Sequence, residues 1–378
     1  MATQTTPSAG VPSAGVAIPT QEPPDGHDVI VIGASAGGVE ALTALAQRLP
    51  TDLPAALFIV LHVPAYGTSV LPSILNRHGP LPAVHPRDGE EIRPGRIYVA
   101  PPDHHLLLDP GRVRLTRGPA ENGHRPAVDT LFRSAARAYG PRVQGVVLTG
   151  TLDDGTAGLQ AIKMRGGIAL AQDPEEALFA SMPRSAIENV PVDYVLPLAP
   201  LAETLVRLAH EPALERRDPV PTETETETET DIETETGVAE FDMAALETPR
   251  EGNPSTYACP DCHGVLWEVL DGDLLRFRCR VGHAFSPETL LATRSENLEG
   301  ALWTALRALE ESAALADRLK GRANQRGHAL AAEQFGEQSR DALQRAAIIR
   351  QALIRGQIIA QSGTPTAEQN ARSRGARR

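Results

Sequence analysis

The chain has 378 residues, of which 41% are hydrophobic, and its 48 acidic and 36 basic residues give a net charge of −12. This length predicts more than one domain, and the acidic balance argues against nucleic acid as a partner. No run of about 18 apolar residues occurs, and the first residues lack the pattern of a signal peptide. We therefore expect a cytoplasmic protein that is not inserted in a membrane.

Shifts in composition divide the chain into segments of different character. Both ends lack hydrophobic periodicity, and a Thr-Glu repeat near residue 230 contains almost no apolar residues. Such segments cannot bury enough apolar surface to fold. In chain order we expect a disordered leader (1–25), an α/β domain (26–213), a flexible acidic linker (214–254), a cysteine-containing module (255–285), a helical hairpin (286–358) and a disordered tail (359–378).

Residues 28–210 alternate short apolar runs with amphipathic stretches. Apolar strands separated by helices are typical of a doubly wound, mostly parallel sheet that is covered on both faces. Within this pattern, Asp109-Pro110-Gly111 is a turn sequence between two alternating stretches, so a small antiparallel hairpin is expected there. The predicted fold class is therefore α/β.

Ser35 is the candidate nucleophile. It lies in a Gly-rich turn between an apolar strand and a helix, at the edge where open α/β sheets bind ligands. Glycines there leave backbone N–H groups exposed, which suits either a phosphate or the oxyanion of an acyl-transfer intermediate. The spacing G-x-S-x-G-G differs from the dinucleotide pattern G-x-G-x-x-G, which argues against a nucleotide-binding protein. A glycine turn with an incidental serine is the other alternative.

His62 and Asp154 are the candidate base and acid. His62 ends the second apolar strand, and Asp154 lies in a Gly-rich turn after a later strand. If these strands are parallel neighbours, their carboxyl ends bring a hydroxyl, an imidazole and a carboxylate to one rim, which is the set that activates a serine. A structural histidine, and helix capping by Asp153 and Asp154, are the alternative interpretations.

The α/β domain resembles the catalytic domain of CheB, the chemotaxis protein-glutamate methylesterase, over residues 28–208. Similar blocks occur in that family's order: IGASAGG, LHVP, GRIYVAPPDHHL, GHRPAVDTLF, LTGTLDDGTAGL and AQDPEEALFASMPRSAI. The resemblance implies that Ser35 is the nucleophile, His62 the base and Asp154 the acid. It implies no cofactor for catalysis.

The resemblance places Ala36, Gly37 and Thr151 near the oxyanion and the substrate. Two of them depart from the family pattern, because Ala36 stands where threonine is usual in chemotaxis members and Thr151 replaces a methionine. Asp153 stands where asparagine is common. These departures leave open a second hypothesis, a non-catalytic or weakly active signalling scaffold that binds partners through the C-terminal part.

The implied reaction is hydrolysis of glutamyl methyl esters on a chemoreceptor or another sensor protein. Deamidation of glutamines by the same acyl-enzyme route is a second activity that the resemblance allows, and a cognate methyltransferase would be a further partner. No receiver domain is expected, because the residues before 28 lack the pattern of an α/β module. Regulation by phosphorylation in cis is therefore not expected.

Four candidate metal ligands lie in one short segment: Cys259, Cys262, Cys279 and His283. Their pattern flanks a predicted hairpin that turns at 270–273 and is typical of a structural zinc site of the Cys3His type. Four protein ligands leave no open position for catalysis. His263 is the rival fourth ligand, although its place next to Cys262 makes joint coordination sterically difficult. We expect a zinc-ribbon-like module, with a hairpin of buried thiols as the alternative.

Two helical stretches follow the cysteines and predict an antiparallel helical hairpin. Ser286 is the expected N-cap of the first stretch, with Pro287 at its first helical position. The sequence 321–327 is expected to break the helix before the second stretch. Such a pair usually serves packing or oligomerisation.

Overall fold

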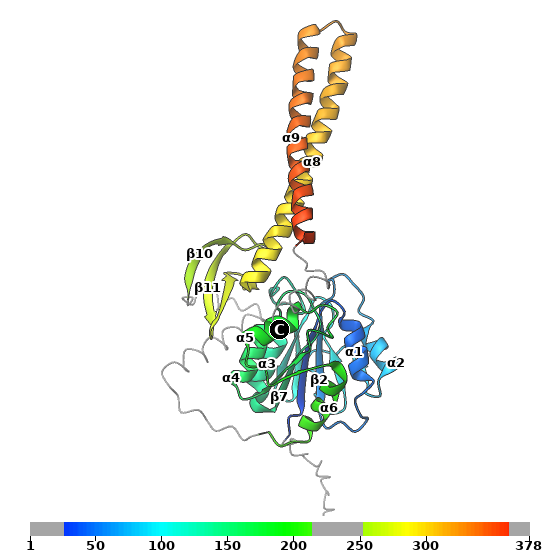
Figure 1. The fold of residues 1–378 in the computed structure, drawn as a ribbon, viewed down its shortest axis with the longest axis vertical. Coiled ribbons are helices and arrows are strands. Elements are labelled where there is room, and N and C mark those ends of the chain that lie inside the picture. Colours follow the sequence, from blue (N-terminus) through cyan, green and yellow to red (C-terminus); the bar gives the residue numbers. More distant parts are fainter. Residues whose placement is uncertain (1–25, 214–251, 363–378) are drawn as a thin grey trace, which may run out of the picture.

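The computed structural model describes residues 26–213 and 252–362 (Figure 1). These residues form an α/β domain, a small antiparallel sheet and a long helical hairpin that extends away from the α/β domain. The expected leader, nearly all of the expected linker and the end of the expected tail lie outside the described residues.

A parallel sheet forms the centre of the α/β domain. Its order is β3-β4-β2-β1-β7-β8-β9, and every neighbouring pair is parallel. The strands are β1 (Val29–Ala34), β2 (Ala56–Leu61), β3 (Ala83–Val84), β4 (Ile97–Val99), β7 (Val143–Val147), β8 (Ile168–Gln172) and β9 (Tyr194–Leu196). The predicted doubly wound, mostly parallel sheet is confirmed.

Helices cover both faces of the sheet and explain why its central strands are continuous apolar runs. Every residue of β1, β2 and β7 is buried, as expected for parallel strands between two helical layers. One face packs on α1 (Gly38–Ala46), α2 (Leu71–His78) and α6 (Leu198–Ala209). The other packs on α3 (Val128–Tyr139), α4 (Thr156–Met164) and α5 (Ser181–Asn189). A short 3-10 helix, Gly140–Arg142, leads into β7.

The predicted antiparallel hairpin is also present. It consists of β5 (His105–Asp109) and β6 (Arg112–Thr116), which form a separate two-stranded sheet. The turn uses Gly111 with φ of 75°, a conformation that glycine adopts without strain. β5 packs on α3, so the hairpin lies over the helical layer that carries the α3 N-terminus.

The cysteine-containing module is a four-stranded antiparallel sheet. Its strands are β10 (Asn253–Ala258), β11 (Val265–Asp271), β12 (Leu274–Cys279) and β13 (Ala284–Phe285). β11 and β12 form the expected hairpin, with Gly272 at φ of 60° in its turn. β10 begins within the range expected for the linker, because its residues pair with β11.

The helical hairpin consists of α8 (Pro287–Gln325) and α9 (Ala329–Ser362). Ser286 caps α8 as expected, since its hydroxyl accepts a hydrogen bond from the Thr289 N–H. The expected break at 321–327 is wrong in extent, because α8 continues to Gln325. A helical glycine costs only about 1 kcal/mol, and packing of the buried Ala323 favours continuation. No helix within the described ranges is both long and apolar enough to span a bilayer.

Gly33 of β1 provides a test of the packing between the sheet and α3. A Cβ at this position would lie 2.2 Å from Val128 Cγ1. We expect Gly33→Ala to lower the free energy of unfolding by about 1–3 kcal/mol, because the helix must shift to relieve the overlap. Urea denaturation followed by far-UV circular dichroism measures this change. Gly300→Ala on α8, where the new methyl meets open space, is the control and should not destabilise the protein. Equal midpoints for Gly33→Ala and the parent chain would contradict this packing.

Candidate active site

Adjacent strands bring the three predicted residues to the carboxyl edge of the sheet. β1 and β2 pair with Ala34 opposite Leu61, so Ser35 and His62 follow directly on neighbouring strands. The His62 N–H donates to the Ala34 carbonyl at 3.1 Å. Asp154 follows β7, which is the other neighbour of β1. The condition stated from the sequence, parallel neighbouring strands, is therefore met.

His62 and Asp154 are in direct contact. His62 Nε2 and Asp154 Oδ2 are 2.7 Å apart, and both side chains are almost fully buried. The other ring nitrogen, His62 Nδ1, is also buried and has no hydrogen-bond partner among the described residues. The carboxylate thus holds the imidazole at its Nε2 edge and leaves Nδ1 available to accept a proton.

Backbone and amide donors surround the Asp154 carboxylate. It accepts hydrogen bonds from the Val128 N–H at 2.7 Å, the Asp129 N–H at 3.2 Å and Asn122 Nδ2 at 3.0 Å. Burial alone would raise the pKa of Asp154, but the hydrogen bond and charge of His62, with the Val128 N–H, hold that pKa well below its usual range. The acid is therefore ionised at neutral pH.

Asp154 and Asp129 cap each other's helices. Asp154 accepts from the first N–H groups of α3, and Asp129 accepts from the Gly155 N–H at 3.0 Å and the Gly158 N–H at 2.7 Å at the start of α4. Asp154 therefore caps a helix, and that helix is α3 and not α4, which follows Asp154 in the chain. Burial and the nearby charge of Asp154 raise the pKa of Asp129 well above its usual value.

His124 is a further residue of the site that was not predicted from the sequence. Its ring stacks on that of His62, with centroids 3.7 Å apart and an angle of 13° between the planes. Burial, followed by the charge of His62, lowers the pKa of His124 to about 4. A neutral aromatic ring therefore covers one face of His62 at neutral pH. Its position in the block GHRPAVDTLF was the available signal, together with Asp129 of the same block.

Ser35 is partly exposed in the turn between β1 and α1. Its N–H donates to the Thr149 carbonyl at 3.0 Å. The neighbouring segment passes so close that a Cβ at Gly150 would lie 2.9 Å from Ser35 Cβ and 2.0 Å from Met182 Sδ. The Ser35 hydroxyl has no hydrogen bond to another described residue. The close packing positions its backbone while the hydroxyl stays available.

The residues expected near an oxyanion surround the N-terminus of α1. Gly37 is the N-cap of α1 with φ of 73°, and its turn is held by a hydrogen bond from Thr149 Oγ1 to the Ala36 carbonyl at 3.0 Å. The N–H groups of Ala36 and Gly37 donate to no other described residue. Unpaired N–H groups at a helix N-terminus favour a negatively charged oxygen. Thr151 is exposed and follows Gly150 in the loop after β7.

The four predicted metal ligands also come together. Their ligand atoms all lie within 4.8 Å of one another: Cys259, Cys262, Cys279 and His283. Cys262 Sγ and Cys279 Sγ are 3.5 Å apart, and Cys279 Sγ and His283 Nδ1 are also 3.5 Å apart. Tetrahedral coordination with metal–sulfur bonds of about 2.3 Å gives ligand separations of about 3.8 Å, so this donor set has the dimensions of a metal site. His263 lies outside the cluster.

The surroundings of this cluster fit a metal. In the absence of a metal, burial raises the pKa of Cys259 to about 12. Three thiols and a half-buried imidazole would then form a core of weak hydrogen bonds, whereas a cation would bind the thiolates and release their protons. Asp261 Oδ2 lies 3.8 Å from His283 Nε2, on the side of the ring opposite the cluster.

The lowered pKa of His124 predicts a pH dependence of stability. Between about 6.5 and about 4 the unfolded chain binds a proton at this residue more readily than the folded chain, so stability falls as the pH decreases through this range. We expect His124→Gln to reduce this acid destabilisation. Thermal unfolding between pH 7 and pH 4.5 measures it, and His78→Gln, at an exposed histidine, is the control. An unchanged pH dependence in His124→Gln would contradict the buried, neutral state of this ring.

Comparison with known proteins identifies the family of the α/β domain. Residues 30–205 match the CheB methylesterase family. A protein of Leptospira interrogans, named "putative protein-glutamate methylesterase/protein-glutamine glutaminase", is 41% identical over 183 residues, which are 48% of this chain and 95% of that protein. An Anaeromyxobacter dehalogenans protein, named protein-glutamate methylesterase/protein-glutamine glutaminase 2, is 42% identical over 181 residues, covering 48% of this chain and 53% of that protein.

A solved structure is also similar. The crystal structure of the Thermotoga maritima CheB methylesterase catalytic domain is 37% identical in sequence, with a TM-score of 0.46, and the match covers 48% of this chain and 98% of that one. This chain covers only about half of the length of the longer curated relatives. From the coverage and identity of the Leptospira protein, together with the matched family region, the chain belongs to the CheB methylesterase family.

Proposed function

We propose that the α/β domain hydrolyses glutamyl methyl esters on a protein through a Ser-His-Asp triad of Ser35, His62 and Asp154. The observation that carries the proposal is the 2.7 Å contact between His62 Nε2 and the ionised Asp154, beside a nucleophile on the neighbouring strand. His62 Nδ1 is the ring atom left for proton transfer. The names of the curated relatives support the same reaction class.

The reaction divides into acylation and deacylation. Ser35 Oγ attacks the ester carbonyl while His62 Nδ1 accepts the hydroxyl proton. The tetrahedral intermediate expels methoxide, which leaves as methanol after taking that proton, and the glutamyl group remains on Ser35. A water molecule then attacks the acyl-enzyme with His62 again as base, which releases the glutamate and restores the serine. Ionised Asp154 stabilises the imidazolium that forms in each step.

The N–H groups of Ala36 and Gly37 are the proposed donors to the oxyanion. Both lie within two residues of the nucleophile, at the N-terminus of α1. Because these donors belong to the backbone, a change of side chain at position 36 leaves them in place. The departure from the family pattern at Ala36 therefore does not favour the scaffold hypothesis, whereas an exposed Thr151 would affect how the substrate packs.

The proposed substrates are methylated glutamates on a chemoreceptor or another sensor protein, which would be encountered in the cytoplasm. A cognate methyltransferase is the proposed source of the ester. Glutamine deamidation by the same acyl-enzyme route is a proposed second activity, in line with the second half of the relatives' names.

For the cysteine-containing module we propose one structural zinc ion bound by the four clustered residues. The mutual distances of the ligand atoms support it, and so does the small apolar core of the module, which contains Leu266, Phe277, Phe285 and Leu290 beside the cysteines. A core of this size folds more readily with a metal. Four protein ligands leave no position for a substrate, so the ion would not bind the substrate or take part in the chemical steps.

The triad predicts the behaviour of single variants. Ser35→Ala and His62→Ala should each lower the rate of methanol release from methylated sensor proteins by about 10³-fold or more, because each removes a group that takes part in bond making. Asp154→Asn should lower kcat strongly with a smaller effect on KM. Gas chromatography of methanol measures the rates. Exposed Ser73→Ala and Asp52→Asn are the matched controls. Folded Ser35→Ala protein with full turnover would refute the proposal.

The zinc proposal predicts different effects for variants of two histidines in the same module. Elemental analysis should find about one zinc per chain, and His283→Ala should lose it, while His263→Ala should retain it. Chelation should unfold the small sheet, as measured by tryptophan fluorescence through Trp267 in β11, and should leave the α/β domain folded, as measured by far-UV circular dichroism. A metal-free chain whose small sheet is folded would disprove the site.

A further inference from the structure

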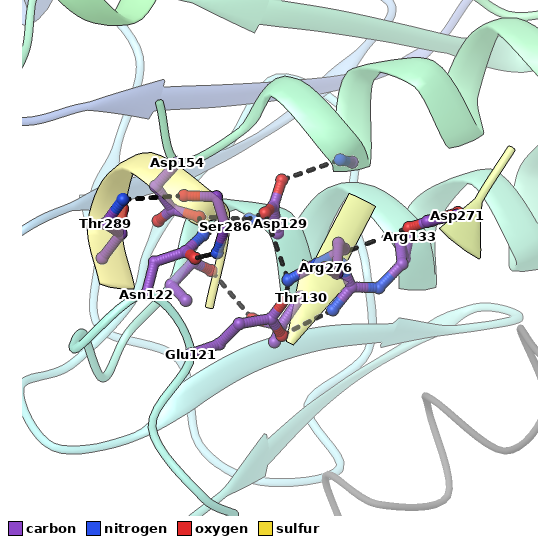
Figure 2. A network of polar contacts seen from close by, with 12 residues as sticks. Glu121, Asn122, Asp129, Thr130, Arg133, Asp154, Asp271, Arg276, Ser286 and Thr289 are labelled. Atoms are coloured by element: carbon purple, nitrogen blue, oxygen red, sulfur yellow. Dashed lines mark hydrogen bonds and ion pairs between the residues drawn. The ribbon is translucent and has the colours of Figure 1, made fainter. Parts of the chain in front are cut away.

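The cysteine-containing module contacts the α/β domain next to the proposed acid (Figure 2). Arg276 of β12 is buried and forms an ion pair with Glu121. The same guanidinium lies 3.7 Å from Asp129 Oδ2. Arg133 of α3 binds the other oxygen of Glu121 at 2.5 Å. Two arginines from separate parts of the chain therefore enclose one buried carboxylate beside the reciprocal caps of α3 and α4.

A second connection runs through Asn122. The Ser286 N–H donates to Asn122 Oδ1 at 3.0 Å, and the Asn122 N–H donates to the Ala284 carbonyl at 2.8 Å. The Asn122 amide group in turn donates to Asp154 Oδ1 at 3.0 Å and to Asp129 Oδ2 at 3.1 Å. A continuous chain of hydrogen bonds thus joins the start of α8 to Asp154 and, through it, to His62.

Asp153, the residue before the proposed acid, is also held by the N-terminus of α8. Ser286 Oγ and Thr289 Oγ1 each donate to Asp153 Oδ1 at 2.9 Å. Asp153 directly precedes Asp154, so the N-terminus of α8 fixes the backbone that carries the acid. Asp153 stands where the family commonly has asparagine, and these two hydroxyls give its carboxylate a partner in this chain.

Charge balance makes Arg276 more than a packing residue. Glu121 and Asp154 are two buried carboxylates in one connected network, together with the buried Asp129, whose pKa is raised, and Arg133 is the arginine of the α/β domain that forms an ion pair with this network within the described residues. Arg276 supplies the second positive charge. The other titratable or charged groups facing this network are His62, His105, His124, Asp153, Asp271, Arg278 and Glu288.

We propose that the cysteine-containing module is a built-in part of the hydrolytic site, in which Arg276 acts as a positioning residue for the Asp154–His62 pair through Asp129 and Asn122. This inference rests on the proposed triad. Arg276 does not touch the reacting atoms, and its role is to balance the charge of the carboxylates and, through its ion pair with Glu121, to hold the segment that carries Asn122 in place. Hydrolysis would then depend on the docked module as well as on the α/β domain.

The test uses the full chain and a fluorophosphonate, a probe that modifies activated serines. We expect Arg276→Gln to lower the second-order rate constant for modification of Ser35 by at least about tenfold. It should also move the acid limb of the pH–rate profile upward by about half a unit or more, because loss of a positive charge favours protonation of nearby groups. Arg276→Lys keeps the positive charge, so its modification rate and its acid limb should stay close to those of the parent chain. Arg307→Gln, an exposed arginine on α8, should change neither.

Glu121→Gln is the second variant and covers the case in which Arg276→Gln fails to fold. It removes a negative charge from the same network, so the acid limb should move to lower pH, whereas a merely structural role predicts no dependence on the sign of the removed charge. The inference is overturned if folded Arg276→Gln is modified at an unchanged or faster rate and the acid limb of its pH–rate profile does not move. It is also overturned if the acid limb does not move in Glu121→Gln. Failure of the triad itself is distinct, because the parent chain would then show no modification that depends on Ser35.

Discussion

The contact between the Asp154 carboxylate and the His62 imidazole is the interaction on which the proposed site depends. A carboxylate this deeply buried stays ionised because the hydrogen bond and charge of His62 stabilise it, together with the first N–H groups of α3, and the Asn122 amide donates a further hydrogen bond to it. Asp129 in turn accepts hydrogen bonds from the N–H groups at the start of α4. The reciprocal caps therefore lock the two helices together and place an ionised acid behind the base, so helix packing and site geometry have one physical origin.

The sheet edge and the three residues on it could be predicted from the sequence because parallel strands impose a register. Continuous apolar runs mark β1, β2 and β7, and the residues that follow them must meet at their carboxyl ends. His124 and Asn122 could not be found in this way, since they lie in a loop outside the strands and reach the site only through the fold around α3. The extent of α8 through Gly321 was equally hidden, because tertiary packing decides whether a helical glycine is tolerated.

The C-terminal part of the chain is joined to the site by specific polar contacts. Spacing alone identified the cluster of Cys259, Cys262, Cys279 and His283, because metal ligands come in short, recognisable pairs. No pattern within the module indicated that Arg276 would be buried against Glu121, more than a hundred residues away. The small sheet thus has two connected roles in this account: its proposed zinc orders β12, and β12 carries the guanidinium that balances the buried carboxylates. The helical hairpin begins at the same junction and extends away from it (Figure 1).

The central claim is that a hydroxyl, an imidazole and an ionised carboxylate act as one unit at the end of β1. Mapping by mass spectrometry of the residue that a fluorophosphonate modifies tests it most directly. We expect a single adduct on Ser35 in the intact chain and almost none in folded His62→Ala protein over the same time, because the serine needs that base to become a nucleophile. An adduct on another serine, or an equally fast adduct on Ser35 without the imidazole, would contradict the account.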